Sequence, residues 1–148
     1  MTYLFIADLH LSPEHPRLVR GFLDLLAHYQ NKNTQLYILG DWFNAWIGDD
    51  YTAPWLDDVI KALKQFNQAG NQVYFQVGNR DFALGKKFLK QFNGILLPDV
   101  DTLKIGHIQI RDSPPFKKAG TFLHKIKVYS FNIKVGKSLF LKERFREI

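Results

Sequence analysis

Three short apolar runs, separated by segments with helical periodicity, dominate the first 80 residues of the chain. The runs cover residues 3–7, 35–39 and 72–77. Each run has the length and composition of one buried strand. Between the runs, apolar side chains recur every three or four positions, from Leu18 to Tyr29 and from Leu56 to Phe66. This spacing predicts two amphipathic helices.

A weaker pattern continues beyond residue 80. It predicts a third helix over about Phe82–Phe92, which ends at Asn93-Gly94, and two short strands near residues 102–105 and 107–110. Strands and helices that alternate in this order are typical of an α/β fold, in which right-handed crossovers join parallel strands. We therefore expect an α/β domain built around a parallel sheet.

Polar residues follow each of the three apolar runs. They are Asp8 and His10 after the first run, Gly40-Asp41 after the second, and Gly78-Asn79-Arg80-Asp81 after the third. The carboxyl ends of parallel strands share one edge of the sheet, and ligands of α/β proteins bind beyond that edge. These residues should therefore converge. Asp8 and His10 are two positions apart, so in an extended chain both side chains would point to the same side.

The converging residues suit a centre for two divalent metal ions. Asp8 and His10 offer a carboxylate and an imidazole, which bind Mn²⁺, Fe²⁺ or Zn²⁺. Asp41 could bridge two ions, and Asn79 could add an amide oxygen to the second. Paired ions clamp phosphoryl oxygens and lower the pKa of a bound water, which then attacks at neutral pH. The pattern thus indicates phosphoester hydrolysis.

Each of these residues, taken alone, has a simpler interpretation. An Asp after a strand is commonly a turn residue or a helix cap, and His10 could simply hydrogen bond to the backbone. Asn79 could occupy a left-handed turn, and Arg80 could form a surface salt bridge with Asp81. The regular recurrence of such groups after three successive strands favours one shared site.

The strand-end blocks carry a family resemblance. Asp8-Leu9-His10, Gly40-Asp41 and Gly78-Asn79-Arg80-Asp81 resemble the first three blocks of the calcineurin-like metallophosphoesterases. Many members of that superfamily have His after the Asn; Arg80 replaces it here, as in the UDP-2,3-diacylglucosamine pyrophosphohydrolases of lipid A biosynthesis. Further similarity to this family lies in residues 5–11, 36–41, 46–50 and 78–82. The fold implied is the N-terminal half of a metallophosphoesterase sandwich.

The resemblance implies a Mn²⁺-dependent hydrolase that cleaves the pyrophosphate of UDP-2,3-diacylglucosamine to UMP and 2,3-diacylglucosamine 1-phosphate. By this resemblance Asp8, His10, Asp41 and Asn79 would be metal ligands, and Asn79 and Arg80 would contact the substrate. A planar, permanently charged guanidinium suits bidentate phosphate binding. The resemblance also implies a cytoplasmic protein that attaches peripherally to the inner membrane, where its lipid substrate lies.

The resemblance covers about residues 1–110 and departs from the family after that. The family continues with a His-Gly-Asp block and a later Gly-His-x-His block, and neither occurs in this sequence. Pro114 stands where the first His is expected, His107 lacks the following Gly-Asp, and the next histidine is His124. We therefore expect a truncated or frame-disrupted chain with an incomplete second metal site, weak metal binding and little or no hydrolysis.

The charge distribution changes at the same point. Residues 1–110 carry ten Lys/Arg and eleven Asp/Glu, whereas residues 111–148 carry ten Lys/Arg and three Asp/Glu. The net charge of +6 therefore comes from the C-terminal segment. We interpret residues 1–110 as a partial metallophosphoesterase domain and residues 111–148 as a basic tail that does not resemble the family.

Two other functions remain open from the sequence. The basic tail interleaves Lys and Arg with aromatic residues, as in nucleic-acid-binding modules and in segments that bind anionic lipid. Another calcineurin-like phosphoesterase activity is the alternative among enzymes.

The chain has no cysteine, so it has neither disulfides nor a Cys-ligated zinc site. Its apolar N-terminus is interrupted by Asp8 and lacks a basic segment before it, so we expect a soluble, intracellular protein.

Overall fold

The structure is a computed structural model that describes residues 1–98, 102–105, 108–111, 127–132 and 142–143. Its main feature is a six-stranded sheet of order β4-β3-β2-β1-β7-β8. The strands are β1 (Thr2–Ala7), β2 (Thr34–Leu39), β3 (Gln72–Gln76), β4 (Ile95–Leu96), β7 (Lys127–Asn132) and β8 (Lys142–Glu143). A separate hairpin comprises β5 (Thr102–Ile105) and β6 (Ile108–Arg111).

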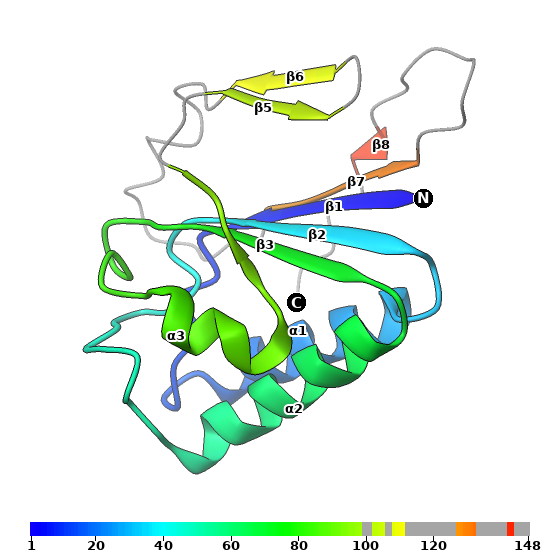
Figure 1. Ribbon diagram of the computed structural model, residues 1–148. Helices are drawn as coiled ribbons and strands as arrows, with labels where there is room; N and C mark the ends of the chain where they lie inside the picture. The colour runs from blue at the N-terminus through cyan, green and yellow to red at the C-terminus, as the bar shows by residue number, and fades with distance from the viewer. Residues whose placement is uncertain (99–101, 106–107, 112–126, 133–141, 144–148) are drawn as a thin grey trace.

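The first four strands of the sheet are parallel to one another, which confirms the expected α/β fold. The β7 strand pairs antiparallel with β1, from Thr2 opposite Asn132 to Ala7 opposite Lys127. Residues of the predicted basic tail thus add two strands to the edge of the parallel sheet, β7 beside β1 and β8 beside β7. Figure 1 shows β7 running alongside β1.

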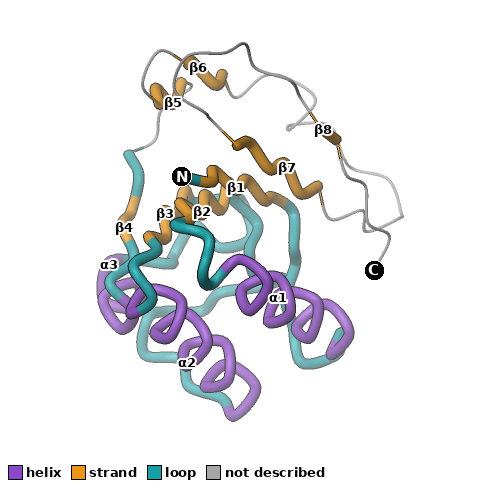
Figure 2. The backbone as a smooth tube through the Cα atoms, turned by 90° about the vertical axis from the view of Figure 1, so that its right-hand side faces the viewer, coloured by secondary structure: helices purple, strands orange, loops and turns teal. Residues whose placement is uncertain are grey.

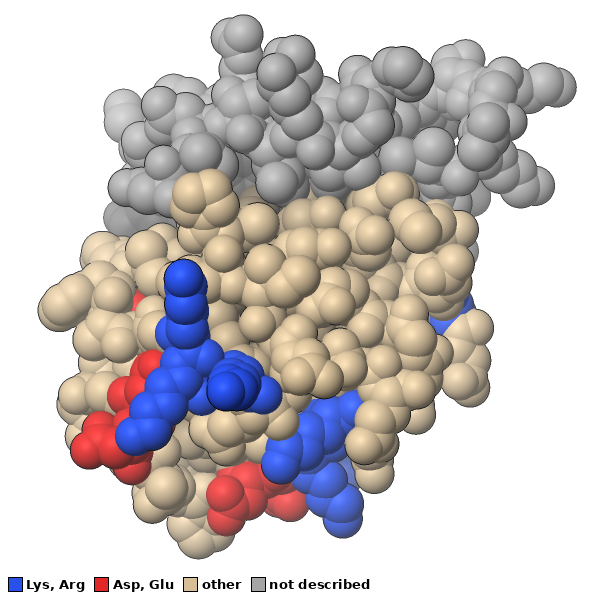
Figure 3. All heavy atoms as spheres, in the orientation of Figure 1, with Lys and Arg blue, Asp and Glu red and all other residues tan. Residues whose placement is uncertain are grey.

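Three helices cover one face of the sheet (Figures 1 and 2). They are α1 (Pro16–Tyr29), α2 (Pro54–Gln68) and the short α3 (Lys86–Leu89), which continues into the 3₁₀ turn η1 (Lys90–Phe92). Both long helices begin with proline, whose fixed φ and missing N–H suit the first helical position. Figure 3 shows Lys and Arg lying close to Asp and Glu over this helical layer, so the charges of both signs are mixed there.

The core lies between the sheet and the helices. Alternate side chains of β1 to β3 point into it with at most 1% of their surface exposed: Leu4, Ile6, Leu36, Ile38, Val73 and Phe75. Trp42 is fully buried next to the rings of Phe22, Phe75, Phe88 and Phe92, at centroid distances of 5.7 to 6.1 Å. Such aromatic side chains bury large areas, so they fix the residues immediately after β2 against the core.

The opposite face of the sheet carries a smaller aromatic cluster. The rings of Phe5 and Tyr37 stack at 5.0 Å, and those of Tyr37 and Tyr74 stack at 4.5 Å. Burial, with the neighbouring Tyr74 and Tyr3, raises the pKa of Tyr37 above its ordinary value. The sheet is therefore apolar on both faces, as expected for strands that are covered on each side.

One buried side chain, Asn71, joins the amino ends of the strands to the ends of the helices. Its oxygen accepts from the N–H of Thr34 at 2.7 Å, and its nitrogen donates to the carbonyls of Gln30 at 2.5 Å and Phe66 at 2.9 Å. Asn71 is only 3% exposed, and these bonds satisfy both its donor and its acceptor. It therefore fixes the start of β2 relative to α1 and α2.

The predicted third helix is wrong in its first turn. Residues 82–85 form a turn and an extended segment, and α3 begins only at Lys86. The carboxylate of Asp49 accepts from the N–H groups of Gly85 at 2.8 Å and Phe88 at 3.0 Å, so it caps the helix at this later position. The other predicted helices and strands are confirmed to within about two residues, whereas the two-residue strand β4 has no counterpart in the sequence prediction.

Candidate metal centre

The segments that follow β1 and β2 continue side by side after the strands end. Asp8 donates its N–H to Gly40 at 3.3 Å, His10 to Asp41 at 3.0 Å, and Leu11 to Trp42 at 2.8 Å. Each of these acceptors is a backbone carbonyl. The pairing fixes residues 8–11 relative to residues 40–44, so the site is built on an extension of the sheet.

The backbone at these positions is not extended, so the expected strand geometry from Asp8 to His10 is wrong. Asp8, His10 and Asp41 have φ values of 55°, 49° and 49°, which lie in the left-handed region. This conformation costs an L-residue roughly 1–2 kcal/mol. Such strain is retained where surrounding structure holds it in place, and it clusters at functional sites.

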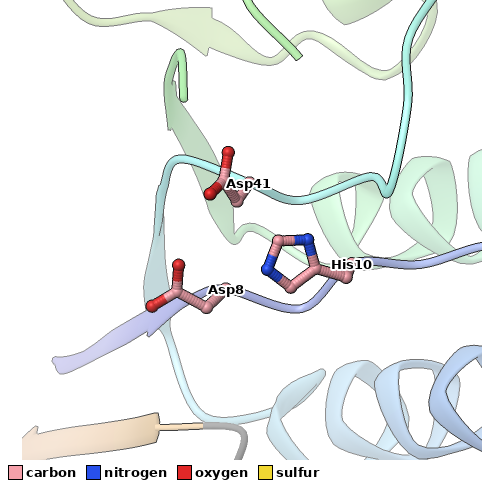
Figure 4. A group of neighbouring side chains, drawn as sticks. All are labelled: Asp8, His10 and Asp41. Atoms are coloured by element: carbon pink, nitrogen blue, oxygen red, sulfur yellow. The ribbon is translucent and has the colours of Figure 1, made fainter. Parts of the chain in front are cut away.

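The left-handed turns nevertheless bring the three side chains together. One donor atom from each of Asp8, His10 and Asp41 lies within 4.8 Å of the other two. All three residues are half-buried. Figure 4 shows the two carboxylates and the imidazole pointing toward a common space at the ends of β1 and β2. Two acidic groups this close repel each other, so a cation between them would be stabilising.

Asn79 and Arg80 lie beside the Asp41 carboxylate. The amide of Asn79 is 2.9 Å from Oδ2 and 3.0 Å from Oδ1 of Asp41, and its nitrogen donates to both when turned toward them. The backbone N–H of Arg80 donates to Oδ1 at 3.0 Å. The structure therefore brings the other three predicted metal ligands, Asp8, His10 and Asn79, close to the carboxylate of Asp41. The backbone of Arg80, a predicted substrate-binding residue, lies there as well.

Gly78 allows this close approach. A Cβ added at Gly78 would overlap the backbone nitrogen and the carboxylate of Asp41. Gly40 has a φ of 78°, and a Cβ there would lie 3.1 Å from the Cα of Gly78. The two glycines therefore pack against each other, and the ends of β2 and β3 come together only because both side chains are absent.

Asp81 does not form the surface salt bridge with Arg80 that was the simpler interpretation of Arg80. The Asp81 carboxylate is fully buried and accepts from the backbone N–H groups of Gly78, Trp42 and Phe43, whereas Arg80 is exposed. Burial raises the pKa of Asp81, and the three N–H donors oppose that shift. Asp81 has no role predicted from the sequence; its position three residues after Gly78, in the same turn, is the signal that could have indicated one.

The chemistry of these donors fits divalent metal ions. Two carboxylates, an imidazole and an amide are ligands of Mn²⁺, Fe²⁺ and Zn²⁺ in proteins. Asn79 lies against both oxygens of Asp41, to which its amide nitrogen donates. Asp8, His10 and Asp41 therefore form a candidate metal site, with Asn79 at its edge.

Comparison with known proteins identifies the family. The sequence pattern described as calcineurin-like phosphoesterase matches residues 1–146. The chain belongs to the calcineurin-like phosphoesterases. This family uses divalent metal ions, which agrees with the donor set at the ends of β1 and β2. The match also extends into the predicted basic tail, as do strands β7 and β8.

The chain is also similar to curated proteins named UDP-2,3-diacylglucosamine hydrolase. It is 47% identical over 105 residues to the protein of Escherichia coli O7:K1, covering 71% of this chain and 44% of the relative. It is 50% identical over 99 residues to that of Edwardsiella ictaluri, covering 67% of this chain and 38% of the relative. The chain thus matches less than half the length of these relatives.

Several sequence predictions lie outside the described residues. They concern Pro114, His107, His124, and the basic and aromatic side chains of residues 111–148. The predicted domain boundary at residue 110 and the nucleic-acid alternative depend on these side chains. Both remain predictions.

Proposed function

We propose that this site takes part in metal-dependent hydrolysis of the pyrophosphate of UDP-2,3-diacylglucosamine, which gives UMP and 2,3-diacylglucosamine 1-phosphate. The observation that carries the proposal is the cluster of Asp8, His10 and Asp41 within 4.8 Å, with Arg80 beside it. Identity of 43–50% to hydrolases of that name supports the choice of substrate within the family.

In this proposal Asp8, His10 and Asp41 hold one ion, and Asp41 and Asn79 contribute to a second. Mn²⁺ suits this mixture of oxygen and imidazole donors. When bound, the ions would lower the pKa of a water molecule and neutralise charge on the phosphoryl oxygens. The backbone around them supplies rigidity, since Asp41 is fixed by the N–H of Arg80 and by the packing of Gly78.

Arg80 and Asn79 would bind the pyrophosphate. The Arg80 side chain is exposed, while its backbone N–H is bonded to Asp41 at 3.0 Å. The guanidinium is therefore anchored next to the proposed metal site but retains the freedom to meet a ligand. It can form paired hydrogen bonds to phosphate oxygens and stabilise the charge that develops there.

Peripheral membrane binding is part of the proposal because the substrate is a lipid. Two large apolar side chains in the segments that follow β2 and β3 are exposed: Ile47, at 81%, and Phe82, at 75%. The exposed Lys86 and Lys87 follow Phe82 closely in the chain. Apolar and cationic side chains together favour an anionic bilayer surface. No helix among the described residues is long and apolar enough to cross a bilayer.

The chain alone should hydrolyse the lipid weakly or not at all, since the later histidine blocks of the family are absent from its sequence. We expect little Mn²⁺-dependent release of UMP from UDP-2,3-diacylglucosamine by residues 1–148. A chimera that joins residues 1–98 to the remaining part of the Escherichia coli relative should release UMP readily. The release is measured by chromatography with and without Mn²⁺.

The control is the same chimera with Asp41→Asn, which should lose the Mn²⁺-dependent release. A folded chimera that binds Mn²⁺, leaves the UDP-sugar lipid intact and cleaves a different phosphoester would contradict the proposed substrate. It would favour the alternative of another calcineurin-like phosphoesterase activity. Activity of the Asp41→Asn chimera equal to that of the parent would contradict the proposed site.

A further inference from the structure

We propose that Asp81 is a positioning residue that joins the turn after β2 to the turn after β3 and thereby fixes the carboxylate of Asp41 for metal binding. The inference rests on the proposed metal site, but Asp81 itself is not one of the ligands. It acts through backbone bonds, so it differs from the residues that meet the ion or the substrate.

The hydrogen bonds of Asp81 define this role. One oxygen, Oδ2, accepts from the N–H of Trp42 at 2.7 Å and from that of Phe43 at 3.4 Å. The other, Oδ1, accepts from the N–H of Gly78 at 2.8 Å. Trp42 and Phe43 directly follow Asp41, and Gly78 directly precedes Asn79. One side chain therefore bridges the two turns that carry the proposed ligands.

Burial makes this bridge rigid. Asp81 has no exposed surface, and its neighbours Trp42 and Phe43 are at most 1% exposed. A buried carboxylate without hydrogen-bond partners is strongly destabilising. Three backbone N–H groups are the hydrogen-bond partners of Asp81. The β2 side of the bridge is anchored by Trp42 in the aromatic core, so the bond from Gly78 draws the β3 turn toward a fixed point.

The bridge determines where the Asp41 carboxylate lies. Gly78 lies so close to Asp41 that an added Cβ would overlap the backbone nitrogen and the carboxylate of Asp41, and the N–H of Arg80 donates to the same carboxylate at 3.0 Å. Both Gly78 and Arg80 belong to the turn that Asp81 holds. Loss of the Gly78–Asp81 bond would let this turn move away and release one side of Asp41. Groups that orient metal ligands in this way typically change metal affinity by about 10–100-fold when mutated.

Asp49 offers a matched control. It is a partly buried carboxylate that, like the fully buried Asp81, accepts backbone N–H groups, in this case from Gly85 at 2.8 Å and Phe88 at 3.0 Å. These two backbone partners lie at the start of α3, beyond the turn that contacts Asp41, and the third donor to Asp49 is the indole N–H of Trp46 at 3.2 Å. Asp49→Asn should therefore weaken the start of α3 without changing the position of Asp41.

The test compares Asp81→Asn with Asp49→Asn in the full chain. An Asn side chain has the same size, but its amide nitrogen cannot accept an N–H, so one side of the bridge is lost. We expect Asp81→Asn to weaken Mn²⁺ binding by about tenfold or more, measured by electron paramagnetic resonance of free Mn²⁺. We also expect faster hydrogen exchange of the Arg80 N–H. Asp49→Asn should leave both readouts within about twofold of the parent.

The exchange readout separates this inference from the proposed metal site. If the parent chain binds no Mn²⁺ but Asp81→Asn still exposes the Arg80 N–H, the metal site is wrong and the bridge is correct. If Asp81→Asn leaves Mn²⁺ affinity and Arg80 exchange unchanged, the positioning role is wrong. Should Asp81→Asn fail to fold, exchange in the parent decides: the N–H groups of Trp42 and Gly78 are protected if the bridge exists, and rapid exchange of either overturns it.

Discussion

Asp41→Asn is expected to reduce the affinity of the chain for Mn²⁺ by at least about a hundredfold, or about 2.7 kcal/mol. Asp41 is the residue that joins the two halves of the proposed centre, because it lies with Asp8 and His10 and also contacts Asn79. Its carboxylate supplies half of the negative charge in the Asp8–His10–Asp41 cluster. Calorimetric titration with Mn²⁺ measures the loss.

The same substitution should leave the metal-free chain as stable as the parent or slightly more stable. Asp8 and Asp41 repel each other in the absence of a cation, and replacement by Asn removes that repulsion at nearly constant size. Asp58→Asn, on the exposed surface of α2, is the matched control and should not change Mn²⁺ affinity. Equal Mn²⁺ binding by Asp41→Asn and the parent would contradict the assignment of Asp41.

Gly78→Ala should destabilise the chain by about 2–4 kcal/mol and also abolish its Mn²⁺ binding. The new Cβ would overlap the backbone nitrogen and carboxylate of Asp41, which are fixed by the core and by Asp81. The methyl group must therefore push apart the ends of β2 and β3. Urea unfolding measures the stability, and a Mn²⁺ titration of the folded variant measures the binding.

Gly70→Ala provides the control for a glycine without such contacts. Gly70 has a φ of 89° and nothing within 4 Å of an added Cβ, so alanine there costs backbone strain alone. We expect a loss of roughly 1–2 kcal/mol and unchanged Mn²⁺ affinity. If Gly78→Ala is no more destabilising than Gly70→Ala and binds Mn²⁺ normally, the close approach of Gly78 to Asp41 is not a requirement of the site.

Much of the fold was predictable because it depends on local patterns. The apolar runs of β1 to β3 and the helical spacing in α1 and α2 reflect which side chains enter the core, and burial enforces both periodicities. The convergence of Asp8, Asp41 and Asn79 followed from the rule that parallel strands end at one edge. These residues are far apart in sequence, yet strand order alone was enough to bring them together.

The features that sequence reasoning missed depend on contacts between distant residues. The start of α3 is set by Asp49, which caps it from 36 residues away. The role of Asp81 depends on Trp42, 39 residues earlier. The left-handed backbone at Asp8 and His10 is imposed by pairing with residues 40–42, and neither residue type requires it. The short β4 forms because it can pair with β3. Its two residues are too few to carry a periodic signal in the sequence.

We infer that Asp8, His10, Asp41 and Asn79 surround one space that holds a divalent cation. Substoichiometric Mn²⁺ added to the ¹⁵N-labelled chain tests this directly, because the paramagnetic ion broadens the amide signals of nearby residues. We expect the signals from residues 8–11, 40–44 and 78–81 to disappear together while those of α1 and α2 persist. Broadening that spares any one of these three segments, or that centres on another part of the chain, would contradict it.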